Sequence, residues 1–364
     1  MIYLDNGATS FPKPASVIRA VGEAMERCAN PGRGSHPASE EGAKALFACR
    51  EAAGRLFDCE AEQVVLTMNC THGLNMAIRT LVRPGDRVVV SGFEHNAVVR
   101  PLYGLGARVM AVGRRLFDPE DTLRQFRKAL DRGARAAVFT HVSNVFGFVL
   151  PVEELAALCR RRGVPFVVDA AQSAGSREVS LRKLGADFIA MPGHKGLLGP
   201  MGTGLLLCGR TPKPLLLGGT GGDSLSRRMP EYLPDRGEAG TANVPGFAGL
   251  AEGIALVAAL GPERIGEQEA ALARQAGELL KERGFEAFSG PGQAGVVSFR
   301  GKGDCEELAM ELAQRGIAVR AGLHCAPVAH ESAGTLDTGT VRLSFGWRST
   351  REDLAALAAA TEKF

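Results

Sequence analysis

The chain has 364 residues, of which 45% are apolar and 23% charged, and its formal net charge is +3. This is the composition of a globular protein, and the length is sufficient for a principal domain and a smaller one. The small net charge and the shortness of the basic clusters argue against nucleic-acid binding. No stretch approaches about 18 apolar residues and the N-terminus lacks an apolar core run, so we expect neither a membrane span nor a signal peptide.

Eight cysteines are scattered along the chain without any CxxC pair. This arrangement argues against a zinc site and against a disulfide framework. We therefore expect no metal site, and a reducing cytoplasm is the compartment that fits best.

Short apolar runs alternate with helical patterns between about residues 64 and 207. Continuous apolar runs are typical of strands buried on both faces, so we predict an α/β fold whose mostly parallel sheet is covered by helices. Ligands of such sheets gather at the carboxyl ends of the strands. In chain order the expected strands are 64–67, 87–91, 108–112, 135–140, 166–169, 187–191 and 202–208, with helices at 72–81, 97–104, 119–131 and 152–161.

The stretch 211–246 is rich in Gly and Pro and reads as a loop. A smaller α+β region follows it, with expected helices at 247–260, 263–283, 304–315 and 350–361 and strands at 295–300 and 341–346. We predict a large domain over residues 16–246 and a small α+β domain over 247–364, to which the N-terminal arm 1–15 is added.

Lys195 lies in a glycine-rich turn, Gly193-His194-Lys195-Gly196, that follows a predicted strand at the ligand-binding edge. An amine in this position can form an imine with an aldehyde cofactor and later carry a proton. Taken alone, the segment fits a surface lysine equally well.

Asp169 ends the strand that precedes Lys195 in the sequence. A carboxylate at the end of a buried strand needs a positive partner, because an unpaired buried charge is costly. A protonated pyridine nitrogen would supply that partner, whereas the alternative is an Asp that caps the next turn. Asp169 and Lys195 together on successive strand ends favour a cofactor site.

Three further segments follow predicted strands at the same edge. Thr71 and His72 begin a predicted helix whose N-terminus can hold a phosphate, although the segment also fits a simple helix cap. His95 could lie flat over an aromatic cofactor ring, and a structural histidine is the alternative. Asn144 could donate to a cofactor oxygen, or it could be a turn asparagine.

These segments, in this order, resemble the class V aminotransferase family, specifically its cysteine desulfurase and selenocysteine lyase branch. The resemblance covers essentially the whole chain. It rests on YLDNGAT (3–9), GRGSH (32–36), TMNCTHGLN (67–75), EHNAVVRP (94–101), HVSNVFG (141–147), VDAAQSAG (168–175), GHKGLLGPMGTG (193–204), EAGTAN (238–243), RAGLHCAP (320–327) and VRLSFG (341–346).

The resemblance implies a fold-type I enzyme that uses pyridoxal 5′-phosphate and forms a homodimer with its active site completed across the interface. It also implies roles for individual residues of this chain. Lys195 would form the Schiff base, Asp169 would pair with the pyridine nitrogen, Gln172 would bind the phenolic oxygen and His95 would stack on the ring. Thr71, His72 and His194 would hold the phosphate, and Thr241 would reach the neighbouring subunit's phosphate. The substrate would be contacted by Asn144, Arg342, Arg320 and, in trans, Arg33.

Cys325, in Arg320-Ala321-Gly322-Leu323-His324-Cys325, matches the nucleophile of the desulfurases. A thiol on a glycine-containing loop beside histidine and arginine can be partly thiolate, whereas for the other seven cysteines we expect small buried hydrophobes. Many relatives carry a second histidine at Leu323 and a serine at Pro192. Only 16 residues separate Cys325 from Arg342, which resembles the short-loop desulfurases and implies a dedicated protein acceptor of sulfur.

We therefore predict an enzyme that converts L-cysteine, or a related amino acid, to alanine and leaves a persulfide on Cys325. Within the same fold, a selenocysteine lyase, a β-lyase or an aminotransferase remains open, because selenium leaves without a cysteine nucleophile and Cys325 would be incidental in the others. From a different class, a cofactor-free interaction scaffold is the remaining alternative. The presence of Lys195, Asp169 and His95 argues against it.

Overall fold

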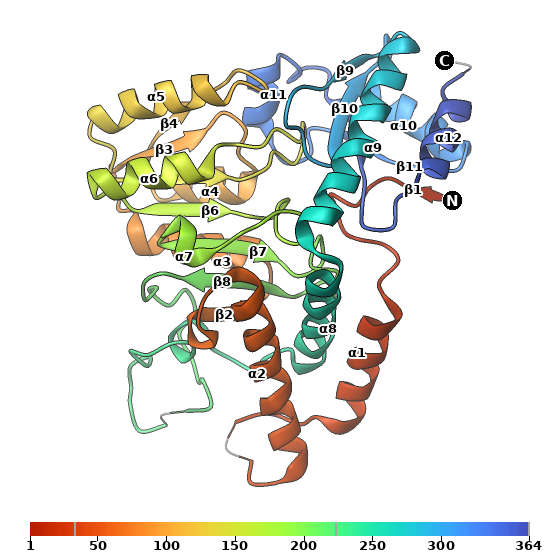
Figure 1. Ribbon diagram of the computed structural model, residues 1–364. Helices are drawn as coiled ribbons and strands as arrows, with labels where there is room; N and C mark the ends of the chain where they lie inside the picture. Colours follow the sequence, from red (N-terminus) through yellow and green to blue (C-terminus); the bar gives the residue numbers. More distant parts are fainter. Residues whose placement is uncertain (33, 223, 363–364) are drawn as a thin grey trace.

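A central seven-stranded sheet organises the protein, which a computed structural model describes over residues 1–32, 34–222 and 224–362 (Figure 1). β8 alone runs antiparallel to both of its neighbours, and the other strands are parallel to one another, which confirms the predicted α/β fold. Across the sheet the order is β2 (Val64–Thr67), β8 (Gly204–Cys208), β7 (Phe188–Pro192), β6 (Phe166–Asp169), β5 (Ala136–Thr140), β3 (Arg87–Ser91) and β4 (Arg108–Val112).

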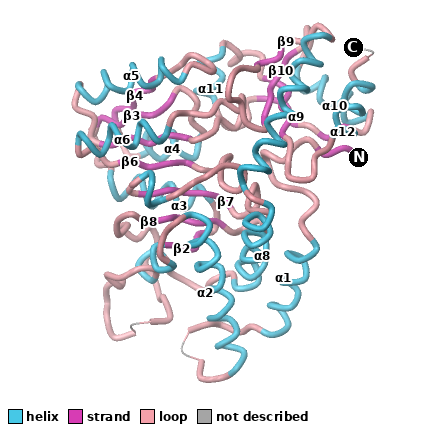
Figure 2. Tube along the Cα trace, in the orientation of Figure 1, coloured by secondary structure: helices cyan, strands magenta, loops and turns pink. Residues whose placement is uncertain are grey.

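Helices cover both faces of this sheet (Figure 2). Successive strand side chains point to opposite faces, so Val88 and Val90 pack in one core and Val89 in the other. One face lies against α3 (Cys70–Leu81) and α4 (Asn96–Gly104). The other lies against α2 (Pro37–Phe57), α5 (Pro119–Asp131), α6 (Val152–Arg162), α7 (Leu181–Leu184) and α8 (Val244–Leu260).

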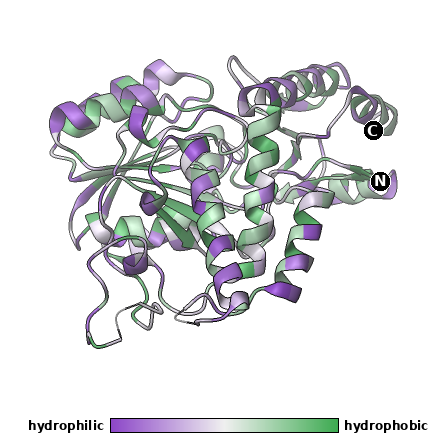
Figure 3. Ribbon diagram, turned by 60° about the horizontal axis from the view of Figure 1, so that its bottom comes forward, coloured by the Kyte–Doolittle hydropathy of each residue, from purple (hydrophilic) through white to green (hydrophobic). Residues whose placement is uncertain are grey.

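The burial of both faces explains the continuously apolar strand sequences. Hydropathy follows this arrangement, because the strands are apolar and the outer helices turn polar residues to solvent (Figure 3). Each fully buried Val, Leu or Phe side chain stabilises the fold by roughly 1.5–3 kcal/mol before the entropic cost of ordering the chain. α1 (Ala15–Arg27) packs on α8, outside this sheet.

A second, antiparallel sheet of four strands forms the C-terminal region, in the order β12 (Arg320–Gly322), β13 (Thr340–Ser344), β10 (Val296–Arg300) and β9 (Glu286–Phe288). Its core includes side chains of α9 (Pro262–Glu282), α10 (Cys305–Gln314) and α12 (Arg351–Ala360), while α11 (Pro327–Ala333) follows the loop after β12. The N-terminal β1 (Ile2–Tyr3) pairs with β11 (Ile317–Ala318) in this region, and β1 and α12 lie on the same side of the molecule (Figure 1). The predicted boundary between residues 246 and 247 stays a prediction.

Two helices begin at the carboxyl edge of the large sheet, and their N-caps come from the residues just before them. The Asn69 side chain accepts from the His72 backbone N–H at 2.9 Å and fixes the start of α3. His95 Nδ1 accepts from the Ala97 N–H at 3.0 Å and fixes the start of α4. Each cap satisfies a backbone donor that the first turn of a helix leaves free.

Within the described residues, no single helix is long and apolar enough to cross a membrane, although α8 and α9 would pass that test as a pair that is bent by 78°.

An ion pair between the buried Arg50 and the partly buried Glu238 ties α2 to the loop that carries Thr241. Arg50 donates to both carboxylate oxygens of Glu238 at 2.6 and 2.7 Å and to the Val64 carbonyl at 2.8 Å, and Glu238 also accepts from the Leu66 N–H. Glu238→Ala would leave the buried guanidinium unpaired, so we expect the free energy of unfolding to fall by about 3–5 kcal/mol. Denaturant titration measures this change.

The exposed pair between Lys44 and Glu41 supplies the matched control, because Glu41→Ala should leave stability unchanged. An equally stable Glu238→Ala protein would contradict the assignment of the Arg50–Glu238 pair as a structural tie.

Candidate functional site

The carboxyl ends of the parallel strands open into a cavity of about 250 Å³. Its walls come from the segments after β2, β3, β5, β6 and β7, which is where an α/β sheet collects its ligands. The cavity brings together most of the residues that the sequence pointed to. They are Thr71, His95, Asn144, Asp169, Gln172, His194 and Lys195.

Lys195 lies just beyond the end of β7, in the turn that the sequence predicted. Its backbone carbonyl accepts from the Leu198 N–H at 2.9 Å, and a Cβ on Gly196 would lie 2.3 Å from the Ala174 carbonyl oxygen, so the next position requires glycine. Burial and the nearby Arg342 lower the pKa of the Lys195 amine, while Asp169 opposes that shift. The amine is therefore easier to deprotonate than a lysine in solvent.

Asp169 is 2% exposed at the end of β6. Its Oδ1 accepts from the Ala171 N–H at 2.9 Å and from the Cys70 thiol at 3.4 Å. Burial and the adjacent Asp169 raise the pKa of Cys70 well above the usual thiol value, so Cys70 remains a protonated donor that orients the carboxylate. The arrangement presents a fixed negative group to the cavity.

The carbonyl oxygen of His194 fixes the Lys195 turn to the N-terminal arm. It accepts from the Ser10 N–H at 3.0 Å, from the hydroxyls of Thr9 at 3.0 Å and Ser10 at 3.1 Å, and from Lys13 Nζ at 2.7 Å. Burial lowers the pKa of the His194 ring to about 4, so the ring is neutral, and its buried Nδ1 has no partner among the described residues. The ring therefore has a free polar atom beside the cavity.

His95 borders the cavity at the start of α4, and burial lowers the pKa of its ring. The preceding Glu94 is fully buried and joins the ends of β3 and β5. Its carboxyl group accepts from the Ser91 hydroxyl and from the Thr140 N–H at 2.9 Å. Burial raises the pKa of Glu94 to about 8, so the group is largely protonated near neutral pH and joins the two strand ends beside His95 without adding a full charge.

The N-terminus of α3 separates this cavity from a larger one of about 1070 Å³. Thr71 lies on the Lys195 side. His72 and Thr241 instead border the larger cavity, and the His72 N–H is already used by the Asn69 cap, so the structure does not bring these two residues to Lys195. Arg33 lies outside the described residues.

Asn144 and Gln172 border the cavity, but each has donated a side-chain N–H elsewhere. Asn144 Nδ2 donates to the His324 carbonyl at 2.8 Å, and Gln172 Nε2 donates to the Gly7 carbonyl at 3.0 Å. A primary amide has two N–H donors, so one from each side chain remains available to a ligand.

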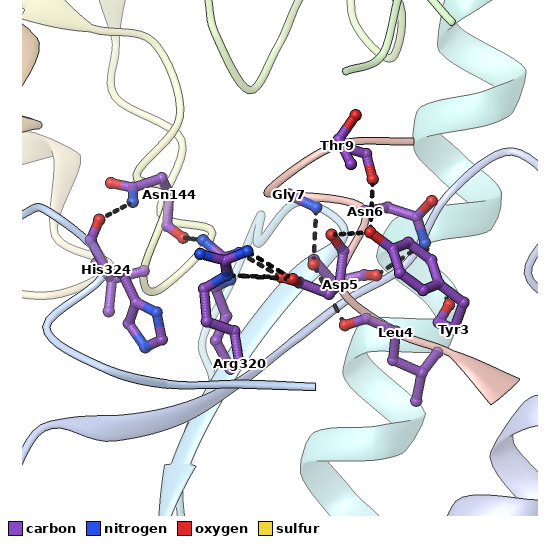
Figure 4. A network of polar contacts seen from close by, with 12 residues as sticks. Tyr3, Leu4, Asp5, Asn6, Gly7, Thr9, Asn144, Arg320 and His324 are labelled. Atoms are coloured by element: carbon purple, nitrogen blue, oxygen red, sulfur yellow. Dashed lines mark hydrogen bonds and ion pairs between the residues drawn. The ribbon is translucent and has the colours of Figure 1, made fainter. Parts of the chain in front are cut away.

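Arg342 and Arg320 meet at Asp5 of the N-terminal arm. Arg342 is 3% exposed and donates from Nη1 to the Asn144 carbonyl at 3.0 Å and from Nη2 to Asp5 Oδ1 at 2.7 Å. Arg320 is half exposed and donates to Asp5 Oδ2 from Nη2 at 3.0 Å (Figure 4). Burial lowers the pKa of Arg342, and the negative Asp5 opposes this shift.

Cys325 is exposed, in contrast to the other seven cysteines, which are buried or half-buried. Its carbonyl accepts from the Asn96 N–H at 2.7 Å, next to His95, and the preceding carbonyl accepts from Asn144, so the thiol loop lies at the rim of the cavity. His324 and Cys325 have φ of 48° and 56°, a left-handed conformation that costs roughly 1–2 kcal/mol for each non-glycine residue. These anchors stabilise a strained turn that presents the thiol.

The histidine beside this thiol does not supply a positive charge. The His324 ring is buried, with Nε2 beside the Thr340 carbonyl at 3.1 Å, and burial lowers its pKa to about 2. Arg320 is the cation of this loop, and its hydrogen bond to Asp5 raises the pKa of the guanidinium, while burial opposes that shift. The positive charge nearest to the loop therefore belongs to an arginine and not to a histidine.

Acidification should destabilise the protein through its buried histidines. Burial lowers the pKa of His141 to about 3, of His324 to about 2 and of His330 to about 4, whereas each is near 6.5 when unfolded. The unfolded chain therefore binds protons at these histidines first, and each histidine lowers stability as the pH drops from about 6.5 toward these values, by up to about 1.4 kcal/mol per pH unit. Buried Glu94 and Glu269, whose pKa burial raises to about 8, act in the opposite direction over the same range. Denaturant midpoints of the wild type and of His330→Gln, compared between pH 7 and pH 5, isolate the histidine effect; an equal pH dependence of the two proteins would refute it.

Sequence reasoning missed Asp5, Lys13 and Glu94. Asp5 and Glu94 lie within segments that carried the family resemblance, yet no local pattern shows that they contact arginine or the end of another strand. Lys13 donates to the His194 carbonyl across 181 positions of sequence. Such contacts are set by the fold rather than by spacing.

Comparison with known proteins agrees with this geometry. A family model described as aminotransferase class-V matches residues 2–357. A "Probable cysteine desulfurase" of Methanothermobacter thermautotrophicus is 34% identical over 100% of this chain and 94% of its own length, and a "Cysteine desulfurase" of Pectobacterium carotovorum is 30% identical over 100% and 93%. The apo structure of a cysteine desulfurase from Thermococcus onnurineus superposes with a TM-score of 0.91 at 33% identity, over 100% of this chain and 94% of that one.

Proposed function

This chain belongs to the class-V aminotransferase family, and from that premise we propose that it is a pyridoxal-phosphate-dependent cysteine desulfurase that converts L-cysteine to L-alanine. Enzymes of this family depend on pyridoxal phosphate. One observation carries the proposal: the exposed Cys325 lies on a loop whose backbone accepts hydrogen bonds from Asn96 and Asn144, and Asn144 lines the cavity that contains Lys195 and Asp169.

The cavity residues fit this cofactor. A buried amine, a fixed carboxylate and a helix N-terminus border one space, and the buried Nδ1 of His194 is available to a phosphate oxygen. We assign Lys195 to the covalent bond, Asp169 to the pyridine nitrogen and His95 to the ring face. Thr71 and His194 would hold the phosphate, and Gln172 and Asn144 would use their second amide N–H groups on cofactor oxygens. When bound, the cofactor supplies an aldehyde that joins to amines and a ring that withdraws electrons from the α-carbon.

The chain's own residues divide the remaining work. Arg342 and Arg320 bind the substrate carboxylate and so orient the amino acid. Lys195 Nζ, whose pKa is lowered by burial, takes the α-proton and later returns it to carbon. Cys325 Sγ, as thiolate, attacks the substrate sulfur, so that an S–S bond forms while the C–S bond breaks with its electron pair left on the β-carbon. Protonation of that carbon gives alanine.

The sulfur on Cys325 must then leave the protein. Because the thiol is exposed on a short loop, a protein acceptor or a small reductant can reach it from solvent. We therefore propose a dedicated protein acceptor in the cell, with sulfide release to a thiol reductant as its laboratory counterpart.

We also propose a homodimer. Exposed apolar side chains gather near the larger cavity that His72 and Thr241 border, and a second copy of the chain would cover them. They are Phe47, Met68, Met201, Leu216 and Leu217. Sedimentation of the purified protein should give twice the chain mass, and a monomer at micromolar concentration would refute this assembly.

The decisive test of activity is product analysis with L-cysteine and a thiol reductant. Alanine and sulfide should appear in equal amounts. Pyruvate in place of alanine would indicate a β-lyase, and a requirement for an oxo acid would indicate an aminotransferase. An inactive protein that binds the cofactor would refute cysteine as the substrate.

A further inference from the structure

We propose that Asp5 is a positioning residue, which holds Arg342 and Arg320 together as one receptor for the carboxylate of an amino-acid ligand. This inference rests on the function proposed above and extends it to the N-terminal arm.

The two arginines lie where their charges oppose each other. Arg320 on β12 and Arg342 on β13 are direct partners in the antiparallel register, and like charges opposite one another are destabilising. Both guanidinium groups donate to the same carboxylate: Arg342 Nη2 lies 2.7 Å from Asp5 Oδ1, and Arg320 Nη2 lies 3.0 Å from Oδ2. Asp5 therefore keeps the two cations side by side in spite of their repulsion.

The backbone of the arm fixes where this carboxylate lies. The Leu4 N–H donates to the Ala318 carbonyl at 2.9 Å, and the Gly7 N–H donates to the Ser344 hydroxyl at 2.8 Å. Asp5 itself forms a bridge with Ser344, two residues beyond Arg342 on the same strand. The arm residues Tyr3, Asn6 and Gly7 gather around Asp5 (Figure 4). Asp5 is thus held by its neighbours and can orient the arginines.

The two arginines keep an unused donor and an unbalanced positive charge. Arg342 donates from Nη2 to Asp5 and from Nη1 to the Asn144 carbonyl, and its buried Nε has no partner among the described residues. Two guanidinium groups and one carboxylate carry a net charge of one positive unit. A single ligand carboxylate neutralises that charge, which matches the carboxylate of an amino acid.

A pair of ligands that differ only in the carboxylate tests this role. L-alanine and ethylamine both react with the cofactor-loaded protein, and their dissociation constants can be read from its absorbance without any turnover. Asp5→Ala should raise the dissociation constant of L-alanine by at least about tenfold and leave that of ethylamine unchanged, because only L-alanine has a carboxylate that the arginines can bind. Asp5→Asn keeps an oxygen for Arg342 and should show a smaller change of the same kind.

The deciding quantity is the dissociation constant of L-alanine divided by that of ethylamine. A ratio that rises in the Asp5 variants supports the proposal, and Asp5→Asn carries the test if Asp5→Ala does not fold. A ratio equal to or below that of the wild type overturns it. Glu286→Ala is the control, because it removes the carboxylate partner of Arg300 at the far edge of the same sheet. If the wild type does not turn over L-cysteine but the ratio still rises in the Asp5 variants, the proposed activity is rejected and the role of Asp5 remains supported.

Discussion

Lys195→Ala should lower the rate of alanine formation from L-cysteine by at least roughly a thousandfold, because one side chain supplies both the covalent attachment and the proton-transferring amine. The cavity keeps Asp169, His95 and the α3 N-terminus, so the variant should still take up the cofactor. Alanine production and cofactor absorbance, measured on the same preparation, separate the two properties.

The exposed Lys44→Ala is the matched control and should be fully active. A Lys195→Ala protein that makes alanine at the wild-type rate would remove Lys195 from the mechanism. Loss of cofactor uptake together with activity would instead show that the remaining walls of the cavity cannot hold the group.

Cys325→Ala should lose sulfide release from L-cysteine by at least about a hundredfold, because no other exposed thiol lies among the described residues to receive the sulfur. Binding of L-alanine should be unchanged, since the arginines and Lys195 remain. Sulfide and alanine assays with Cys28→Ala, a half-buried cysteine far along the sequence, provide the control. Full sulfide release by Cys325→Ala would show that the thiol is incidental. If Cys325→Ala is inactive on L-cysteine but active on L-selenocysteine, the protein also has selenocysteine lyase activity.

Much of the fold was predictable because its strands are buried on both faces. The runs at 64–67, 87–91 and 166–169 became β2, β3 and β6 with the expected bounds. The helix expected at 72–81 begins two residues earlier, since the Asn69 cap sets its start. The short strands β9, β11 and β12 escaped prediction, because two or three partly buried residues carry no readable alternation.

The candidate site was predictable where strand ends follow one another in the sequence. Asp169 ends β6 and Lys195 follows the end of the paired strand β7, so both line one cavity, and the family resemblance, now confirmed, pointed to both. The contact of Asp5 with Arg342 spans 337 positions and has no local signature. The roles of His72 and Thr241 stay predictions, because both side chains border a separate cavity.

The central claim is that sulfur from L-cysteine passes to Cys325. Mass spectrometry of the peptide that contains Cys325, after the cofactor-loaded protein has reacted with L-cysteine in the absence of reductant, tests it most directly. We predict a peptide heavier by the mass of one sulfur atom, which a reductant removes and which Lys195→Ala fails to form. An unmodified Cys325 peptide in a sample that has produced alanine would contradict the account.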